Sequence, residues 1–191
     1  MGLILPCESQ SQDIIDARLI IKKLGIKVKV VNLFPIYKVY KKTLPYANKI
    51  SYGNLKARIR MSVLYYFANK YNYLVCGTSN KSEILMGYFT KHGDGAADIL
   101  PIGNLFKKQV RQLAKSLNLP KRIIDKAPSA GFWSGQTDEA ELGVTYEQID
   151  NIIPRLIKNK KQIYPLSLVN RVKYRMRTSE HKRQPSAICK I

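Results

Sequence analysis

The chain has 191 residues, of which 45% are hydrophobic and 24% charged, a balance that is typical of a soluble globular protein and excludes a wholly disordered chain. The length predicts a single domain over 1–191, with a core that needs no metal or disulfide staples. The net charge of +20 favours a polyanionic partner such as nucleic acid, an anionic membrane or a phosphorylated small molecule.

The hydrophobic pattern of the first third of the chain predicts a strand, a helix and a second strand. The strand covers 3–5, the helix covers 12–24 and ends at Gly25, and the second strand covers 28–33. A strand, helix and strand within about thirty residues form a βαβ unit, whose strands pair in parallel with a right-handed crossover.

The remaining elements continue the alternation. A long helix is predicted over 54–71, another strand over 73–76, and a helix that begins near Asn80. This order predicts an α/β fold in which helices flank a parallel sheet, with ligands beyond the carboxyl ends of the strands. Further helices are predicted over 105–117, from Pro120, over 146–157 and over 165–177, with loops over 87–103 and 127–137.

The basic residues are unevenly distributed. Residues 17–82 hold 14 bases and no acid, residues 151–191 hold 11 bases and one acid, and residues 83–150 hold nine of the 13 acids. A lysine-rich composition accounts for most of these charges as ordinary solvated faces, so charge alone does not choose a function.

The N-terminus and the cysteines indicate a compartment. Leu5 is followed at once by Pro6, Cys7 and Glu8, which predicts no signal peptide. No apolar run approaches the roughly 20 residues of a membrane span. Three widely spaced cysteines without a CxxC pair fit plain thiols in a reducing environment. We therefore expect a cytoplasmic protein without a membrane partner.

The segment 77–83, Gly-Thr-Ser-Asn-Lys-Ser-Glu, is the first candidate for chemistry because it follows a strand and opens a helix. The free N–H groups of a helix N-terminus suit phosphate, Thr78 can add a hydrogen bond, and Glu83 can hold Mg²⁺. The structural alternative is a helix cap that pairs Ser79 or Asn80 with Glu83. From this segment alone, the cap is favoured.

Three further segments carry groups that suit a phosphorylated ligand. Lys91 and Asp98 flank the glycine turn 93–95, where the backbone can approach a ligand closely. Arg58 lies one turn into a helix and can grip a phosphate bidentately. The segment 180–183, Glu-His-Lys-Arg, can clamp a polyanion. Taken singly, these segments also fit a surface turn, a solvated helix face and a basic tail.

Together, six segments are far more specific than any one of them, and their order and register resemble the ammonia-dependent NAD synthetases of the adenine nucleotide alpha-hydrolase, or ATP pyrophosphatase, fold. The resemblance covers essentially the whole chain from Gly2. It implies the conversion of deamido-NAD, ATP and ammonia into NAD, AMP and pyrophosphate through an adenylated carboxylate. The segments are GN-KARIRM (53–61), GTSNKSE (77–83), GYFTK-GDG--D (87–98), LPIGNLFKKQVR (100–111), PSAG-W-GQTDE-ELG (128–143) and EHKR (180–183).

The resemblance also implies roles for particular residues by motif position. Mg²⁺ and cationic side chains would offset the repulsion between a carboxylate and a polyphosphate, and Glu83 would bind the Mg²⁺. Thr78, Lys107 and Ser129 would contact ATP. The residues implied for deamido-NAD are Arg58 or Arg60, between which the motif does not decide, Lys91, Asp98, His181 and Lys182.

The family works as a homodimer with the dinucleotide site at the subunit interface, and the resemblance implies the same here. We expect the helix over 54–71 to be the dimer element. No amidohydrolase segment is recognised, so free ammonia or a separate subunit would supply the nitrogen.

The sequence departs from the family at its start. Family members begin with a strand, a Ser-Gly-Gly-x-Asp-Ser phosphate loop and a helix, whereas this sequence opens at what resembles the second strand. Residues 134–138 imitate the letters but follow no strand, so they are no substitute. Two alternatives stay open: a non-catalytic or split-enzyme dinucleotide-binding subunit, and a basic RNA-binding relative. The basic residues show no regular aromatic interleaving, which disfavours nucleic acid.

Overall fold

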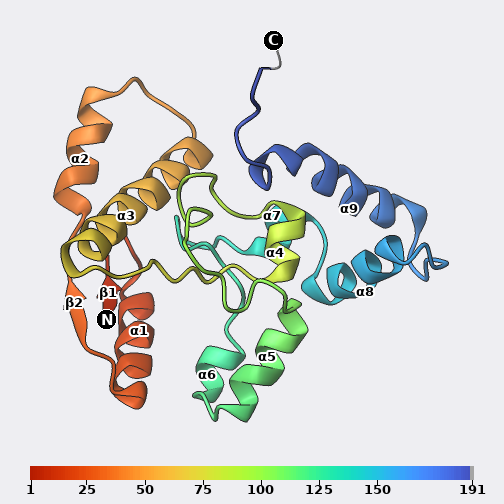
Figure 1. Ribbon diagram of the computed structural model, residues 1–191, viewed down its shortest axis with the longest axis horizontal. Coiled ribbons are helices and arrows are strands. Elements are labelled where there is room, and N and C mark those ends of the chain that lie inside the picture. The colour runs from red at the N-terminus through yellow and green to blue at the C-terminus, as the bar shows by residue number, and fades with distance from the viewer. Residues whose placement is uncertain (190–191) are drawn as a thin grey trace.

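A computed structural model describes residues 1–189 of the chain (Figure 1). The N-terminal elements lie on one side, α8 and α9 lie on the other, and α4 lies between them. In chain order the elements are β1 (Gly2–Ile4), α1 (Ser11–Leu24), β2 (Val28–Val30), α2 (Phe34–Thr43), α3 (Lys49–Tyr71), α4 (Lys81–Met86), α5 (Lys107–Ser116), α6 (Lys121–Ile124), α7 (Asp138–Leu142), α8 (Tyr146–Ile157), α9 (Leu166–Thr178) and the 3₁₀ helix η1 (Glu180–Lys182).

The predicted βαβ unit is confirmed, and with it the α/β class with a parallel sheet. β1 and β2 pair in parallel, with Gly2 opposite Val28 and Ile4 opposite Val30, and α1 makes the crossover. Within residues 1–189 the sheet has two strands. No helix in this part of the chain combines the length and the apolar character that crossing a bilayer requires.

The strand predicted over 73–76 is wrong in its extent. It is reduced to a single parallel bridge between Cys76 and Ile99, in which Gly77 N donates to the Ile99 carbonyl at 2.9 Å and Asp98 N donates to the Val75 carbonyl at 3.0 Å. A strand needs a continuous partner, and here the pairing segment is too short to provide one.

The helix predicted from Asn54 begins earlier, at Lys49, because Asn48 caps it: its side chain accepts a hydrogen bond from Ser51 N at 2.9 Å. Helix α2 was not predicted. Asn32 accepts from Phe34 N at 3.0 Å, and a proline near the first helical position favours the turn. Leu33, which was expected in a strand, therefore ends up just ahead of α2.

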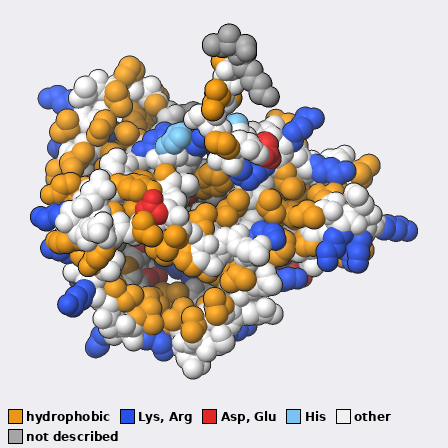
Figure 2. Space-filling view, viewed as in Figure 1, with side chains coloured by type: hydrophobic (Ala, Val, Ile, Leu, Met, Phe, Trp, Pro, Cys, Tyr) orange, Lys and Arg blue, Asp and Glu red, His pale blue; other side chains and the backbone are white. Residues whose placement is uncertain are grey.

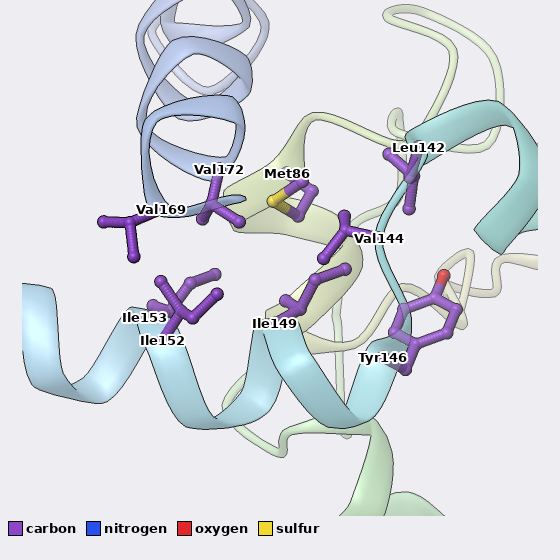
Figure 3. Close-up of a cluster of buried hydrophobic side chains, with 9 residues drawn as sticks. All are labelled: Met86, Leu142, Val144, Tyr146, Ile149, Ile152, Ile153, Val169 and Val172. Carbon is purple, nitrogen blue, oxygen red and sulfur yellow. The ribbon is translucent and has the colours of Figure 1, made fainter. Parts of the chain in front are cut away.

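The core is divided into separate clusters, which leaves room between them. The largest cluster joins α4, α7, α8 and α9 (Figure 3), and each fully buried aliphatic side chain in it contributes about 1.5–3 kcal/mol. A second cluster packs Cys7, Leu33, Tyr37 and Ile59 together. The largest cluster consists of Met86, Leu142, Val144, Tyr146, Ile149, Ile152, Ile153, Val169 and Val172.

The surface agrees with the expectation that most basic residues are solvated. On the face drawn in Figure 2, Lys and Arg side chains are scattered around the outline, with apolar side chains between them and few acidic ones.

An ionic cluster fastens α1 to the segment around α6. Asp16, which is 8% exposed, accepts from Arg122 and from Lys126 Nζ at 2.8 Å, and Asp13 lies 2.6 Å from the same ammonium. The hydrogen bond from Lys126 lowers the pKa of Asp16 to about 2, with help from Gln12 and Arg122. The Asp16 carboxylate is thus stabilised in the folded state.

Asp16→Asn should lower the free energy of unfolding by about 1 kcal/mol at pH 7, the upper end for partly exposed ion pairs, which corresponds to about 2–4 °C in Tm. The folded-state pKa lies below the unfolded one, so this stability is present above about pH 4 and is lost as the pH falls toward 2. Thermal melts of both proteins should therefore converge over that range. A difference that stays constant down to pH 2 would contradict this assignment.

Candidate functional site

Several residues singled out from the sequence line one cavity of about 580 Å³, which we call the central cavity. Thr78 and Glu83 come from the turn that opens α4, Lys107 is the first residue of α5, and Ser129 belongs to the loop before α7. Arg60 of α3 lines the same cavity. Elements far apart in the sequence therefore converge on one space.

The turn that opens α4 is built by its cap. Asn80 accepts from Glu83 N at 3.1 Å, and Glu83 Oε2 accepts in return from Asn80 N at 3.0 Å. This is the capping box that the sequence offered as the structural alternative, with Asn80 rather than Ser79 as the cap. The cap leaves the second oxygen of Glu83 available to another group.

That second oxygen, Oε1, lies 2.8 Å from Lys107 Nζ. Both side chains are largely buried, at 15% exposed for Glu83 and 19% for Lys107. The ammonium also lies 4.8 Å from the centre of the Tyr146 ring, a cation–π distance. The central cavity thus holds a charged lysine with its countercharge in place.

Asp138 adds a second carboxylate to the central cavity. Its Oδ2 accepts from the Tyr146 hydroxyl at 2.9 Å, while its Oδ1 has no hydrogen-bond partner among the residues that the structure describes. Burial raises the pKa of the Asp138 carboxyl, against the opposing effects of Tyr146 and Lys107. A buried carboxylate oxygen without a partner fits a ligand that brings either a hydrogen-bond donor or a cation.

A second group of predicted residues meets beside a smaller cavity of about 330 Å³, the α3–α9 cavity. Arg58 donates to the Lys91 carbonyl from Nε and from a terminal nitrogen, both at 3.3 Å. Lys91 Nζ donates to the His181 carbonyl at 2.6 Å. Lys182 lines the cavity, and its ammonium donates to the carbonyls of Gly87 and Phe89 at 2.9 Å; burial lowers the pKa of Lys182.

The loop before α7 forms part of the wall of both cavities, since its residue Phe132 lines each of them. Lys56 holds this loop: its buried ammonium donates to the Phe132 carbonyl at 2.9 Å and pairs with Glu8 at 2.8 Å. Gly53 makes the close approach possible, because a Cβ there would lie 2.7 Å from the Phe132 ring. Arg60, which lines the central cavity, donates to the Leu5 carbonyl and to Ser9 Oγ, both at 3.2 Å.

Asp98 lies apart from both groups. Its carboxylate accepts from Val75 N at 2.7 Å and from the Tyr65 hydroxyl at 3.1 Å. It is not among the described residues that line these two cavities. In this structure it ties the segment around residue 98 to the segment around residue 75.

The NAD synthase family model matches residues 1–186. The chain belongs to the NAD synthase family. It is 50% identical over 196 residues to the NH(3)-dependent NAD(+) synthetase of Methanocaldococcus jannaschii, covering 96% of this chain and 75% of that protein. It is 45% identical over 194 residues to the protein of the same name from Methanococcoides burtonii, covering 96% and 74%.

Solved structures place the fold in the same family. The structure of NMN synthetase from Francisella tularensis superposes with a TM-score of 0.90 at 43% identity, covering 99% of this chain and 78% of that chain. The NH3-dependent NAD synthetase from Campylobacter jejuni superposes with a TM-score of 0.83 at 32% identity, covering 98% and 76%.

Sequence reasoning missed Ser82, Asp138 and Asp150, which surround the Lys107–Glu83 pair. Asp138 belongs to the Gln-Thr-Asp-Glu segment 136–139, which contributes to the family resemblance, but the sequence analysis assigned it no role. The sequence does carry a signal for Asp150, because it is an acid among the isoleucines of α8. In the structure its side chain is only 1% exposed. An acid in that position is almost never fully buried unless it is paired.

Lys56→Met should loosen the loop before α7, because the Phe132 carbonyl loses a charged donor, at a cost of about 1.5–3 kcal/mol in unfolding free energy. Trp133, the single tryptophan of the chain, reports on this loop: its emission should shift to the red and its quenching by acrylamide should increase. The exposed Lys70→Met on the same helix is the matched control. Equal fluorescence in both variants would show that Lys56 does not hold the loop.

Proposed function

We propose that the chain catalyses the ATP-dependent amidation of deamido-NAD to NAD with ammonia. The relatives named NH(3)-dependent NAD(+) synthetase are 42–52% identical to it over most of its length. The observation that carries the proposal is the convergence of Thr78, Glu83, Lys107 and Ser129 on one cavity, next to a second, basic group of residues.

The reaction brings two anions together, and the residues of the central cavity would offset the repulsion between them. The nicotinate carboxylate attacks the α-phosphorus of ATP, and the bond to the departing pyrophosphate breaks. Ammonia then attacks the acyl carbon, AMP leaves, and a proton of the nitrogen is released. The Lys107 ammonium would offset the charge of the phosphates, while the Thr78 and Ser129 hydroxyls would donate to phosphate or ribose oxygens.

Mg²⁺ fits the chemistry of the donor set. Glu83 and Asp138 both bring carboxylates to the central cavity, and one buried Asp138 oxygen lacks a donor within residues 1–189. Mg²⁺ prefers hard oxygen ligands and is usually held by one or two carboxylates together with substrate phosphates and waters. Glu83 would hold the ion, which would supply charge neutralisation at the leaving pyrophosphate.

The basic group beside the α3–α9 cavity would hold deamido-NAD. Arg58 donates to the Lys91 carbonyl and Lys91 donates to the His181 carbonyl, while Lys182, which follows His181, lines the cavity. Of the two candidate arginines, Arg58 suits this role, since Arg60 lines the central cavity instead. Asp98, which the resemblance also assigns to deamido-NAD, lies apart from this group and is therefore not part of the proposed site.

Arg58→Ala and Lys91→Ala should each raise the Kd for deamido-NAD about tenfold or more, because each removes a charged donor to the ligand. Isothermal titration calorimetry measures the effect, with the exposed Lys115→Ala as the control. Wild-type affinity in both variants would remove these residues from the proposed site.

We infer a homodimer that pairs through α2 and α3, an extension of the dimer element expected from the sequence. Several large apolar side chains of these helices and their connection are exposed, more than single scattered residues would explain. The exposed apolar residues include Phe34, Ile36, Val39, Tyr40, Leu44, Tyr46 and Ile50.

A Val39→Asp, Ile50→Asp double variant should sediment as a monomer, because two carboxylates would be buried in the interface. The wild-type chain should sediment as a dimer. A monomeric wild-type chain, or a variant that stays dimeric, would contradict pairing through this face.

The relative named NMN synthetase suggests a second candidate substrate, nicotinate mononucleotide, because that structure superposes with a TM-score of 0.90. The chemistry is the same amidation of a nicotinate carboxylate. The two substrates differ in the adenylate group, which deamido-NAD carries and nicotinate mononucleotide lacks.

The test is an assay of NAD formation from deamido-NAD, Mg·ATP and ammonium, with nicotinate mononucleotide in a parallel reaction. We expect NAD formation that requires all three components. Activity only after addition of a Ser-Gly-Gly-x-Asp-Ser segment would support the split-enzyme alternative. Absence of both turnover and saturable deamido-NAD binding, with RNA binding that falls steeply with salt, would overturn the proposal in favour of the RNA-binding relative.

A further inference from the structure

A buried carboxylate behind the central cavity joins three helices. Asp150 of α8 is 1% exposed and Ser82 of α4 is fully buried. The Ser82 hydroxyl donates to Asp150 Oδ1 at 2.5 Å, and Lys108 N donates to Asp150 Oδ2 at 2.8 Å. The same Ser82 oxygen accepts from Lys107 N at 2.9 Å. Every oxygen of this Asp150–Ser82 node therefore has a partner.

The node does the work of a helix cap. The first N–H groups of a helix lack partners within it and carry partial positive charge. The residue before α5 is Phe106, whose side chain offers no acceptor, so Ser82 and Asp150 receive the N–H groups of Lys107 and Lys108 instead. A buried carboxylate is costly unless it is fully hydrogen-bonded, and here the start of α5 supplies what it needs.

The node also fixes both members of the ion pair in the central cavity. Lys107 is held through its own backbone, and Glu83 directly follows Ser82. The separation of 2.8 Å between Lys107 Nζ and Glu83 Oε1 thus depends on where Asp150 places α5 relative to α4.

We propose that Asp150, acting through Ser82, is a positioning residue that aligns Lys107 with Glu83 to receive the triphosphate of Mg·ATP. This inference rests on the proposed function. Asp150 itself touches neither substrate. Within residues 1–189, no hydrogen bond or ion pair joins the basic residues at the α3–α9 cavity to the node, so deamido-NAD binding should not depend on it.

Two variants break the node at different bonds. Asp150→Asn keeps the shape but leaves one acceptor oxygen for two donors. Ser82→Ala removes the acceptor of Lys107 N and leaves the Asp150–Lys108 bond in place. The matched control is Glu147→Gln, which removes one exposed carboxylate from the same helix, α8.

The experiment titrates each protein with Mg²⁺·α,β-methylene-ATP, in which the bond between the α- and β-phosphates cannot be cleaved, and separately with deamido-NAD. We expect Asp150→Asn and Ser82→Ala to raise the Kd of the ATP analogue by about tenfold or more, with the Kd of deamido-NAD unchanged. Glu147→Gln should change neither. A merely structural role would weaken both ligands together, through the loss of folded protein.

Unchanged binding of the ATP analogue in both variants, or equal weakening of both ligands, would overturn the inference while the proposed function stands. A wild-type chain that binds neither ligand would overturn the proposed function, and the inference with it. If Asp150→Asn does not fold, Ser82→Ala decides alone, because it leaves the Asp150 carboxylate bonded to Lys108.

Discussion

One nearly buried ion pair, Lys107 with Glu83, places a positive charge in the wall of the central cavity. Holding two charges away from water is costly, and a well-packed apolar pair would often be as stable. A cavity for a polyphosphate must nevertheless contain positive charge before its ligand arrives. Glu83 balances that charge in the meantime, while Tyr146 offers the ammonium its ring face.

The fold serves this pair by leaving space between separate cores. The cluster around α8 and α9 and the cluster around α2 and α3 lie on opposite sides of the molecule, with α4 between them (Figure 1). The loop before α7, held by Lys56, reaches across and gives one wall to each cavity. The net charge of +20 adds a general attraction for anions, whereas the cations at these two cavities are placed to bind a particular one.

The features predicted correctly from the sequence are those that local patterns determine, such as helix bounds and motif positions. The periodicity of 146–157 matched α8 to the residue, and motif positions found four residues that share a cavity. The strand over 73–76 failed because a strand depends on a partner that propensity does not supply, and α2 was missed because its start depends on Asn32 and a proline. Asp150 could not be given a role, since its partners lie 42 and 68 residues away along the chain.

Hydrogen–deuterium exchange with and without Mg²⁺·α,β-methylene-ATP tests most directly whether the Lys107–Glu83 cavity receives the nucleotide. Protection on ligand addition should be concentrated in two segments, 78–83 and 105–109, which are far apart in the sequence and meet in the folded protein. Protection confined to the basic stretch after residue 151, or the absence of protection in both segments under saturating ligand, would contradict it.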